Sequence, residues 1–499
     1  MNRKLTLLLL MPRVALSLSG FQQNIRTMAS SLHPSPHSVC PKCRGEGKVR
    51  QRQSKKARFN QQQQSNSKVP PSNNVNLKPC NPCQGSGLQP RDDPDQKDSP
   101  FTADKKFPSV AIIGGGIGGL ALGLACWHRN IPFTIYERDT SFRQRQQGYG
   151  LTLQQASKAL KGFGIDLEGG ITSTRHVVHT PDGEVVAEWG LRKWGRDAQK
   201  SVKRQNIHIA RQALREQLLQ AVGNQVQWDY QLTSLNETEK EVELTFSQTD
   251  GTTKTAKADL VVGADGIRST VRSLVIGESE MPLRYLGCIV ILGICPLDAI
   301  AGASESELLD GHTVFQTADG TTRLYAMPFS STESMWQLSY PVDEQVAITT
   351  SREKRLKQAA LEKCGAWHSP IPQLLHATPP ELVSGYPVYD RALLEKEMLS
   401  SSNRITLLGD AAHPMSPFKG QGANQALLDA LSLARALYRN PENSFLETYQ
   451  EEMLARSAVK VKASAEAAEF LHTEVAIQKG NVTRGAAAAS RRSDVDNGE

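Results

Sequence analysis

The chain has 499 residues, enough for two packed regions, and its 39% hydrophobic and 22% charged residues are ordinary for a folded protein. The net charge of +7 is uneven: residues 1 to 90 carry fourteen Lys and Arg against one acid, Glu46, giving +13 and leaving 7 − 13 = −6 for the rest. Because the basic excess lies outside the larger, mildly acidic part, we do not expect nucleic-acid binding.

Residues 1–39 are predicted to be a targeting presequence or a disordered tail, since they contain Arg3, Lys4, Arg13 and Arg26 but no acid. The apolar run from Leu5 to Met11 is too short to span a bilayer, so we expect no transmembrane segment. The stretch resembles the bipartite plastid presequence of algae with secondary plastids, in which cleavage falls before a phenylalanine. A mitochondrial presequence and an untranslocated tail are the alternatives.

Two copies of the pattern C-x-x-C-x-G-x-G follow, CPKCRGEG at residues 40–47 and CNPCQGSG at residues 80–87. Two such pairs of thiolates can complete a closed tetrahedral site, so the pattern predicts one structural zinc ion held by Cys40, Cys43, Cys80 and Cys83. It resembles the zinc finger of DnaJ-type chaperones, which usually carries four copies and two zincs. A redox dithiol and disulfides are the alternatives. We expect a disordered insert between the copies, a linker over residues 88–106, and a zinc module that binds a protein partner.

A dinucleotide-binding pattern begins at the apolar run Val110 to Ile113. Gly114, Gly116 and Gly119 then form G-x-G-x-x-G before a helix, and a second apolar strand ends at Glu137, eighteen residues beyond Gly119. Such glycines allow a tight turn and close approach to a pyrophosphate, and the terminal acid binds a ribose hydroxyl. The pattern predicts FAD or NAD at this site, because the acid disfavours a 2′-phosphate.

The middle of the chain alternates as strands do, with hairpin turns at Pro181-Asp182-Gly183 and at Thr249-Asp250-Gly251. Further strands are predicted around residues 284–295, 312–316, 323–327 and 335–340. Two motifs then each place an acid after an apolar strand: DLVVGADGIRSTVR, with Asp265, and RITLLGDAAHPMSPFKGQGAN, with Asp410. An acid there can accept a sugar hydroxyl, and free N–H groups at the helix start can meet an anionic group.

The three motifs together resemble those of the class A flavoprotein monooxygenases of the para-hydroxybenzoate hydroxylase type, over roughly residues 107 to 470. The resemblance implies that the glycines hold the FAD pyrophosphate, Glu137 the adenosine ribose, and Asp410 the ribityl chain. It implies that Asp265 also serves NAD(P)H, and that His413 and Pro417 lie near the flavin. The implied cofactor-binding residues are Gly114, Gly116, Gly119, Glu137, Arg138, Arg211, Asp265, Gly266, Gly409, Asp410, Pro417, Gly420, Gly422 and Asn424.

The implied fold is α/β: a Rossmann-like FAD-binding domain interrupted by a mixed or antiparallel β-sheet substrate domain, with C-terminal helices. Phe315, Tyr325, Met327 and Trp336 could face the substrate, although core packing is the default expectation. The expected FAD-binding segments are 107–175, 259–283 and 391–442, the substrate-domain segments are 176–258 and 284–390, the C-terminal helices span 443–479, and a disordered tail spans 480–499.

The implied activity is an NAD(P)H-consuming monooxygenase, which hydroxylates or epoxidises a small aromatic or isoprenoid-like substrate with O₂ through a flavin C4a-hydroperoxide. A flavin-dependent reductase of the geranylgeranyl reductase type and a non-enzymatic zinc interaction protein with a degenerate flavin fold are the alternatives. The intact glycines and acids argue against the latter.

Overall fold

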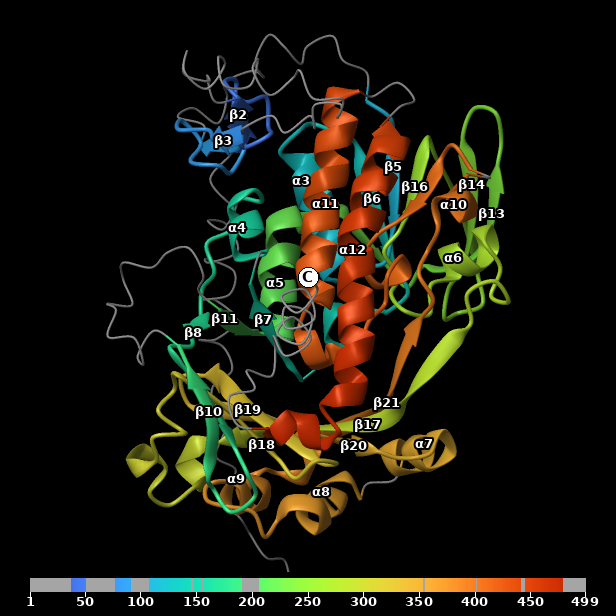
Figure 1. Cartoon of the computed structure of the whole chain (residues 1–499). Coiled ribbons are helices and arrows are strands. Elements are labelled where there is room, and N and C mark those ends of the chain that lie inside the picture. Colours follow the sequence, from blue (N-terminus) through green and yellow to red (C-terminus); the bar gives the residue numbers. More distant parts are fainter. Residues whose placement is uncertain are drawn as a thin grey trace, which may run out of the picture.

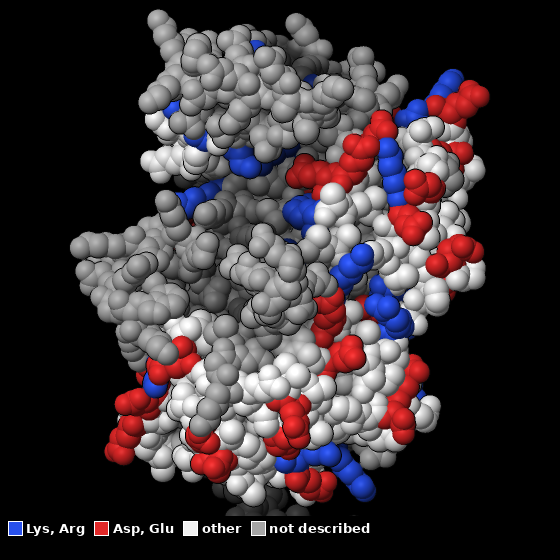
Figure 2. All heavy atoms as spheres, in the orientation of Figure 1, with Lys and Arg blue, Asp and Glu red and all other residues white. Residues whose placement is uncertain are grey.

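The computed structural model describes residues 37–50, 77–90, 107–144, 148–154, 156–190, 206–352, 355–400, 402–440 and 445–478. The expectations for a presequence before residue 37, for the insert over 51–76 and for the tail over 480–499 fall outside the described residues. Basic and acidic side chains are interspersed over the described surface shown in Figure 2.

A five-stranded sheet of order β12-β6-β5-β16-β22 forms the centre of the FAD-binding domain, and every neighbouring pair in it is parallel. Its middle strands are continuous apolar runs because both faces are covered, as parallel sheets require. The strands are β5 (Val110–Ile113), β6 (Phe133–Glu137), β12 (Val226–Trp228), β16 (Leu260–Gly263) and β22 (Ile405–Leu407).

Long helices pack on this sheet and on one another (Figure 1). Helix α3 (Ile117–Trp127) is buried along almost its whole length between β5, α5 (Arg211–Val222) and α11 (Gly422–Arg439). Helix α12 (Phe445–Phe470) crosses α11 and reaches the second sheet, as the predicted C-terminal helix. Among the described residues, no helix combines the length and the apolar character needed to cross a bilayer.

A seven-stranded sheet of order β10-β9-β18-β19-β20-β17-β21 forms the substrate domain. It is mixed, since β9 and β18 run parallel while the other pairs are antiparallel. Helices α7 (Glu344–Arg352), α8 (Leu356–Cys364) and α9 (Ile371–Ala377) lie on the side away from the FAD-binding domain (Figure 1). The strands are β9 (Arg175–His179), β10 (Val185–Trp189), β17 (Leu283–Pro296), β18 (Thr313–Ala318), β19 (Arg323–Ser330), β20 (Glu333–Pro341) and β21 (Val383–Arg391).

Both predicted hairpins form, but only β9–β10 belongs to the seven-stranded sheet. The second, β14 (Val242–Ser247) and β15 (Thr253–Ala258), joins β13 (Gln231–Glu237) in a separate three-stranded sheet, which contacts α6 (Thr270–Val275). The remaining elements connect the two domains or flank them: β7 (Gly150–Leu153), α4 (Ala156–Lys161), β8 (Ile171–Thr172), β11 (Ile207–Ala210) and α10 (Lys396–Leu399).

The two cysteine-containing copies form one small module, whose boundaries differ from the expected ones. Strand β1 (His37–Val39) pairs with β4 (Leu88–Pro90), and β2 (Lys48–Arg50) pairs with β3 (Leu77–Pro79). Residues 37–39 are therefore part of this module rather than of a presequence, and residues 88–90 are part of it rather than of a linker. We call residues 37–50 and 77–90 the cysteine module.

Candidate functional site

The three motifs meet because they follow the carboxyl ends of three adjacent parallel strands. The glycines come directly after β5, Asp265 follows β16, and Asp410 follows β22. Strand β5 lies between β6 and β16, which is where the strand order reverses, and ligands of open α/β sheets bind at such a point. The common topology therefore explains why segments so distant in sequence form one site.

The three glycines of the first motif serve different purposes. Gly114 has a φ of +113°, and a Cβ on it would lie 2.5 Å from the carbonyl oxygen of Ala264. A Cβ on Gly119 would lie 2.0 Å from the carbonyl oxygen of Gly114, so only glycine lets α3 pack this closely on the turn. A Cβ on Gly116 would meet nothing within 4 Å, because it would project into a cavity.

The N-terminus of α3 is suited to an anion. Gly116 is its N-cap, so no side chain of that residue occupies the N–H groups of the first turn, and the first turn carries no acid. Arg215 of α5 donates its Nε–H to the carbonyl oxygen of Gly115 at 2.9 Å and thereby fixes the turn. Free N–H groups at a helix start, together with the helix dipole, bind phosphate, so these residues fit the pyrophosphate of a dinucleotide.

A cavity of about 530 Å³ runs from this turn to the seven-stranded sheet. Eight of the expected cofactor-binding residues line it: Gly116, Arg211, Gly266, Gly409, Asp410, Pro417, Gly420 and Gly422. Gly114, Gly119, Glu137, Arg138, Asp265 and Asn424 are not among its lining residues, and neither is His413.

Glu137 lies beside the glycine turn, as its place at the end of β6 predicts. Its carboxylate is buried and accepts hydrogen bonds from the backbone N–H groups of Gly115, at 2.7 Å, and Asp139, at 3.0 Å. A carboxylate has further lone pairs, so Glu137 can still accept from a ribose hydroxyl. The neighbouring Arg138 is exposed.

Asp265 and Asn424 do not line the cavity, and local structure uses their side chains; their contact with FAD stays a prediction. The Asp265 carboxylate accepts from the hydroxyl of Ser269 at 2.5 Å and from the N–H of Thr270 at 2.7 Å, which holds the start of α6. Asn424 donates to the carbonyl oxygens of Thr152, at 2.9 Å, and Gly420, at 2.8 Å. Both side chains therefore shape the walls of the site rather than face its interior.

Asp410 projects into the cavity. Its side chain is exposed there, yet the surrounding protein desolvates the carboxylate and raises its pKa, against the lowering effect of His413 and Arg211. A hydroxyl-rich chain such as a ribityl group could donate to this carboxylate, which matches the role that the resemblance implies.

His413 faces away from the cavity and supports the loop from behind. Its Nε2 lies 2.7 Å from Oδ2 of Asp429 on α11, and that oxygen also accepts the N–H of Gly409 at 2.9 Å. Oδ1 of Asp429 accepts from Arg456 of α12 at 2.7 Å. Burial alone would lower the pKa of His413, but Asp429 raises it above the usual value. His413 is therefore part of a buried network that holds the Gly409–Asp410 turn.

The far wall of the cavity is formed by side chains that alternate along β19 and β20. Tyr325 and Met327, two of the residues that the sequence suggested could face the substrate, line the cavity together with Gln337 on the neighbouring strand. Trp336 points to the opposite face, where it donates to the hydroxyl of Thr378 at 2.8 Å. Sequence reasoning missed several other lining residues, namely Tyr149, Arg268, Leu292, Arg323, Met335, Tyr386 and Val388.

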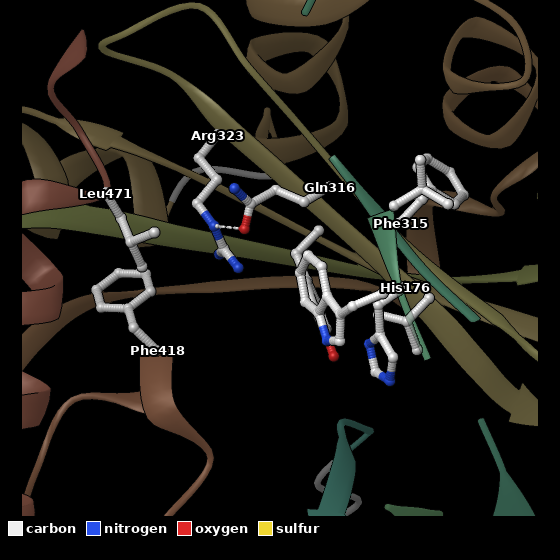
Figure 3. A pocket seen from close by; sticks show the side chains of 10 residues that line it. His176, Phe315, Gln316, Arg323, Phe418 and Leu471 are labelled. Atoms are coloured by element: carbon white, nitrogen blue, oxygen red, sulfur yellow. Dashed lines mark hydrogen bonds between the residues drawn. The ribbon is translucent and has the colours of Figure 1, made fainter. Parts of the chain in front are cut away.

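A smaller pocket, shown in Figure 3, adjoins this wall. Arg323, Tyr325 and Phe418 line both spaces. Its volume is about 20 Å³, room for one water molecule, and Phe315 lines it beside His176. The Nε–H of Arg323 donates to Oε1 of Gln316 at 2.7 Å. Phe315 thus lines this small pocket and otherwise packs in the domain core.

The four predicted metal ligands also come together, in the cysteine module. Their four sulfur atoms are buried and lie within 4.8 Å of one another. The Sγ atoms of Cys40 and Cys80 are 3.9 Å apart and those of Cys43 and Cys83 are 3.6 Å apart, far longer than a disulfide bond. The N–H groups of Gly47 and Gly87 point at the sulfurs of Cys43 and Cys83, at 3.2 and 3.3 Å.

Comparison with known proteins agrees with this geometry. Residues 108–464 match the model of the family described as FAD binding domain. The aurachin C monooxygenase/isomerase of Stigmatella aurantiaca is 31% identical over 66% of this chain and 80% of its own length. Chloroplastic zeaxanthin epoxidase of Oryza sativa subsp. japonica is 28% identical over 70% of this chain but 54% of its own length. The 6-hydroxynicotinate 3-monooxygenase of Pseudomonas fluorescens is 27% identical over 66% and 82%.

Solved structures share the fold. HpxO of Klebsiella pneumoniae, complexed with FAD and uric acid, superposes with a TM-score of 0.63 at 21% identity, covering 79% of this chain and 94% of HpxO. The 2,6-dihydroxypyridine-3-hydroxylase of Arthrobacter nicotinovorans gives a TM-score of 0.64 at 19% identity, covering 76% and 96%. The family match spans more than half of the 499 residues and contains all three motifs. The chain therefore belongs to the FAD binding domain family and is a flavoprotein oxidoreductase.

Proposed function

We propose that this protein is an FAD-dependent monooxygenase that uses NAD(P)H and O₂ to hydroxylate or epoxidise a small aromatic or isoprenoid-like substrate. The observation that carries the proposal is the single cavity that joins Gly116 and Asp410 at the dinucleotide end to Tyr325 and Tyr386 at the sheet. A monooxygenase needs both ends in one enclosed space, because the flavin must reach the substrate. The relatives named above as monooxygenases and an epoxidase support this reaction type.

The chain's own residues bind, orient and exclude water, while bound FAD would supply the redox chemistry. The N–H groups at the start of α3 would hold the phosphates, and Arg211, which lines the same cavity, would lie along the FAD. The Asp410 carboxylate, kept in position by the His413–Asp429 pair, would accept from the ribityl hydroxyls. Pro417 and Gly420 line the cavity beside it and allow a flat ring to approach the backbone.

The substrate end is apolar with a few polar groups. Its apolar walls exclude water and are formed by Leu292, Met327, Met335, Val388 and Phe418. A monooxygenase requires such walls, because water would otherwise cause the activated oxygen to be lost as peroxide. Burial raises the pKa of Tyr386, so its phenol keeps its proton at neutral pH and can donate a hydrogen bond. Such a lining suits a ring or an isoprenoid end that bears one or two hydrogen-bonding groups.

The cysteine module is proposed to bind one structural Zn²⁺. Sulfur atoms at the corners of a tetrahedron with Zn–S bonds of 2.3 Å would lie about 3.8 Å apart, close to the two measured separations. All four cysteines are buried, and N–H groups stabilise thiolate sulfurs, so the residues fit a closed structural site. A protein partner for this module stays a prediction.

A plastid location is also proposed. It rests on the basic, acid-free first 36 residues, and one relative, zeaxanthin epoxidase of rice, is described as chloroplastic. Residues 1–36 fused to a fluorescent protein should direct it to plastids when expressed in an alga, and fluorescence confined to mitochondria or to the cytosol would contradict the proposal.

The function is tested with the purified full-length protein, which should be yellow with noncovalent FAD near one per chain. Oxidation of NADH and NADPH is followed against aromatic and isoprenoid compounds, with peroxide measured in parallel and ¹⁸O₂ used to trace the inserted oxygen. A true substrate should speed NAD(P)H oxidation, lower the peroxide yield and acquire one labelled oxygen. A protein that cannot be reconstituted with FAD would exclude a monooxygenase. Reduced products without labelled oxygen would also exclude it and would indicate a reductase.

A further inference from the structure

The cysteine module lies against the FAD-binding domain, at the C-terminal ends of α3 and α11 (Figure 1). On one side, His37 of the module packs edge-to-face on His128, which directly follows α3, with ring centroids 5.4 Å apart. On the other side, Arg435 and Arg439 in the last turns of α11 reach the module. The module is thus joined to both helices by specific contacts.

Arg435 contacts both cysteine-containing copies at once. Its Nε–H donates to the carbonyl oxygen of Gly45 in the first copy at 2.9 Å, and its Nη2 donates to that of Ser86 in the second at 3.4 Å. These two carbonyl groups face one guanidinium only while the two copies are held together. The strand pairs β1–β4 and β2–β3 already join the two copies, and a metal ion bridging the four sulfurs would fix their relative positions further. The Arg435 contacts should therefore be strongest when the metal is bound.

The charges across this contact are complementary. Glu46 is the single acid among the first 90 residues, and its Oε1 lies 2.5 Å from Nε of Arg439. Glu46 also attracts Arg129, which is buried, and Arg435, which is half-buried. Burial is the largest cause of the lowered pKa of Arg129, about 10, and the nearby Arg435 lowers it further, whereas Glu46 opposes the shift. The acid of the module therefore compensates a cluster of three arginines that would otherwise repel one another.

The opposite ends of the same helices line the FAD cavity. Gly116, Ile117 and Gly118 at the start of α3 and Gly422 and Ala423 at the start of α11 are among its lining residues. The helices pack against each other, and at 1.5 Å per residue α11 spans about 27 Å. Because an α-helix is stiff over this length, a contact that fixes the C-terminal ends also limits how the N-terminal ends move at the cofactor.

We propose that the metal-bound cysteine module clamps the C-terminal ends of α3 and α11, and that loss of the metal weakens FAD binding at the other ends. This inference rests on the zinc and FAD sites proposed above. The flavin site thus responds to the metal state of a module that it does not touch.

The test uses the full-length protein and three readouts: zinc per chain, the FAD dissociation constant from the recovery of flavin fluorescence, and circular dichroism. Arg435→Gln leaves all four cysteines in place and should keep one zinc per chain. It should raise the dissociation constant of FAD about five- to tenfold, in the lower part of the range found for coupled sites. Cys80→Ser should lose zinc and give a similar rise. The double variant should be no worse than Cys80→Ser, because both changes remove the same contact.

Lys357→Gln is the matched control, since Lys357 also donates to two backbone carbonyl oxygens, of His376 and Thr378, but in the substrate domain and away from the module. It should bind FAD as the wild type does. If Cys80→Ser fails to fold, zinc is instead removed from the wild type with a chelator and then restored. Equal FAD affinity in the wild type, Arg435→Gln and the zinc-free protein would overturn the clamp while leaving both sites intact. Wild-type protein that binds FAD but never zinc would also overturn the clamp. In that case the proposed zinc site would be wrong, while the proposed FAD site would stand.

Discussion

Gly116 and Gly119 belong to one motif, yet replacing them should cause opposite kinds of damage. Gly116 has a φ of −79° and a ψ of −177°, which any residue adopts, and a Cβ there meets nothing within 4 Å. Gly116→Val should therefore leave the free energy of unfolding of the FAD-free protein within about 0.5 kcal/mol of the wild type. The added methyl groups would instead occupy the space that the pyrophosphate needs.

The size of the binding defect follows from the contacts that would be lost. Displacing the pyrophosphate from two N–H groups at the start of α3 removes two charge-assisted hydrogen bonds, each worth about 1.5 kcal/mol. The sum of about 3 kcal/mol corresponds to an affinity lower by about 100-fold or more. Gly116→Val should consequently be purified colourless but folded.

Gly119→Ala should destabilise the protein itself. Its Cβ would lie 2.0 Å from the carbonyl oxygen of Gly114, so α3 would have to move away from the turn. Such overpacking costs about 1–3 kcal/mol, more than the 0.5–1 kcal/mol or so that alanine gains over glycine within a helix. Urea unfolding of both FAD-free variants and FAD titration of both measure the contrast. Stoichiometric FAD in Gly116→Val, or an FAD-free Gly119→Ala protein as stable as the wild type, would refute this reasoning.

Three further predictions concern the acids and the histidine around the site. Asp410→Asn should weaken FAD binding but not the FAD-free fold, since burial raises the Asp410 pKa and its charge is unfavourable there; isothermal titration and melting curves would separate the two effects. His413→Gln should lower the melting temperature more at pH 6 than at pH 9. The raised pKa of His413 stabilises the folded protein fully below the unfolded pKa of about 6.5, and this stabilisation is lost as the pH rises through the pKa of the folded state. An equal difference in melting temperature at both pH values would contradict the ion pair with Asp429. Asp265→Ala should cost about 1–2 kcal/mol of stability through the lost start of α6, which urea titration measures; unchanged stability with slower NAD(P)H oxidation would restore the role first expected for Asp265.

The parts of the site that sequence could predict are those that depend on local geometry. A glycine pattern after an apolar strand requires a turn beside a helix, so the roles of Gly114 and Gly119 follow from their spacing. The two hairpins were also predictable, because turn residues and alternation are local signals. The substrate wall was only partly predictable. Alternation along one strand does not show which face of the sheet meets the cavity. Only the pairing of β19 with β20 places Tyr325 and Met327 on the cavity face and Trp336 on the opposite face.

Other features depend on contacts between distant residues. Asp265 and Asn424 carry side chains of the kind that bind ligands, but the tertiary fold decides which groups they form hydrogen bonds with. The contact between Arg435 and Gly45 joins residues 390 positions apart, so no local sequence pattern predicts it. Strands β1 and β4 are three residues each and carry little alternation, so no local pattern distinguishes them from a tail or a linker.

The order of strands in the parallel sheet has a consequence for biosynthesis. Strand β16 pairs with β5 on one side and with β22 on the other, and β22 is made roughly 140 residues later in the chain. While the ribosome makes β17 to β21 of the substrate domain, one edge of the buried strand β16 has no partner for its N–H and C=O groups, and such an edge is a template for aggregation. That edge is covered only when β22 has emerged, and FAD could bind stably only after Asp410 has followed it.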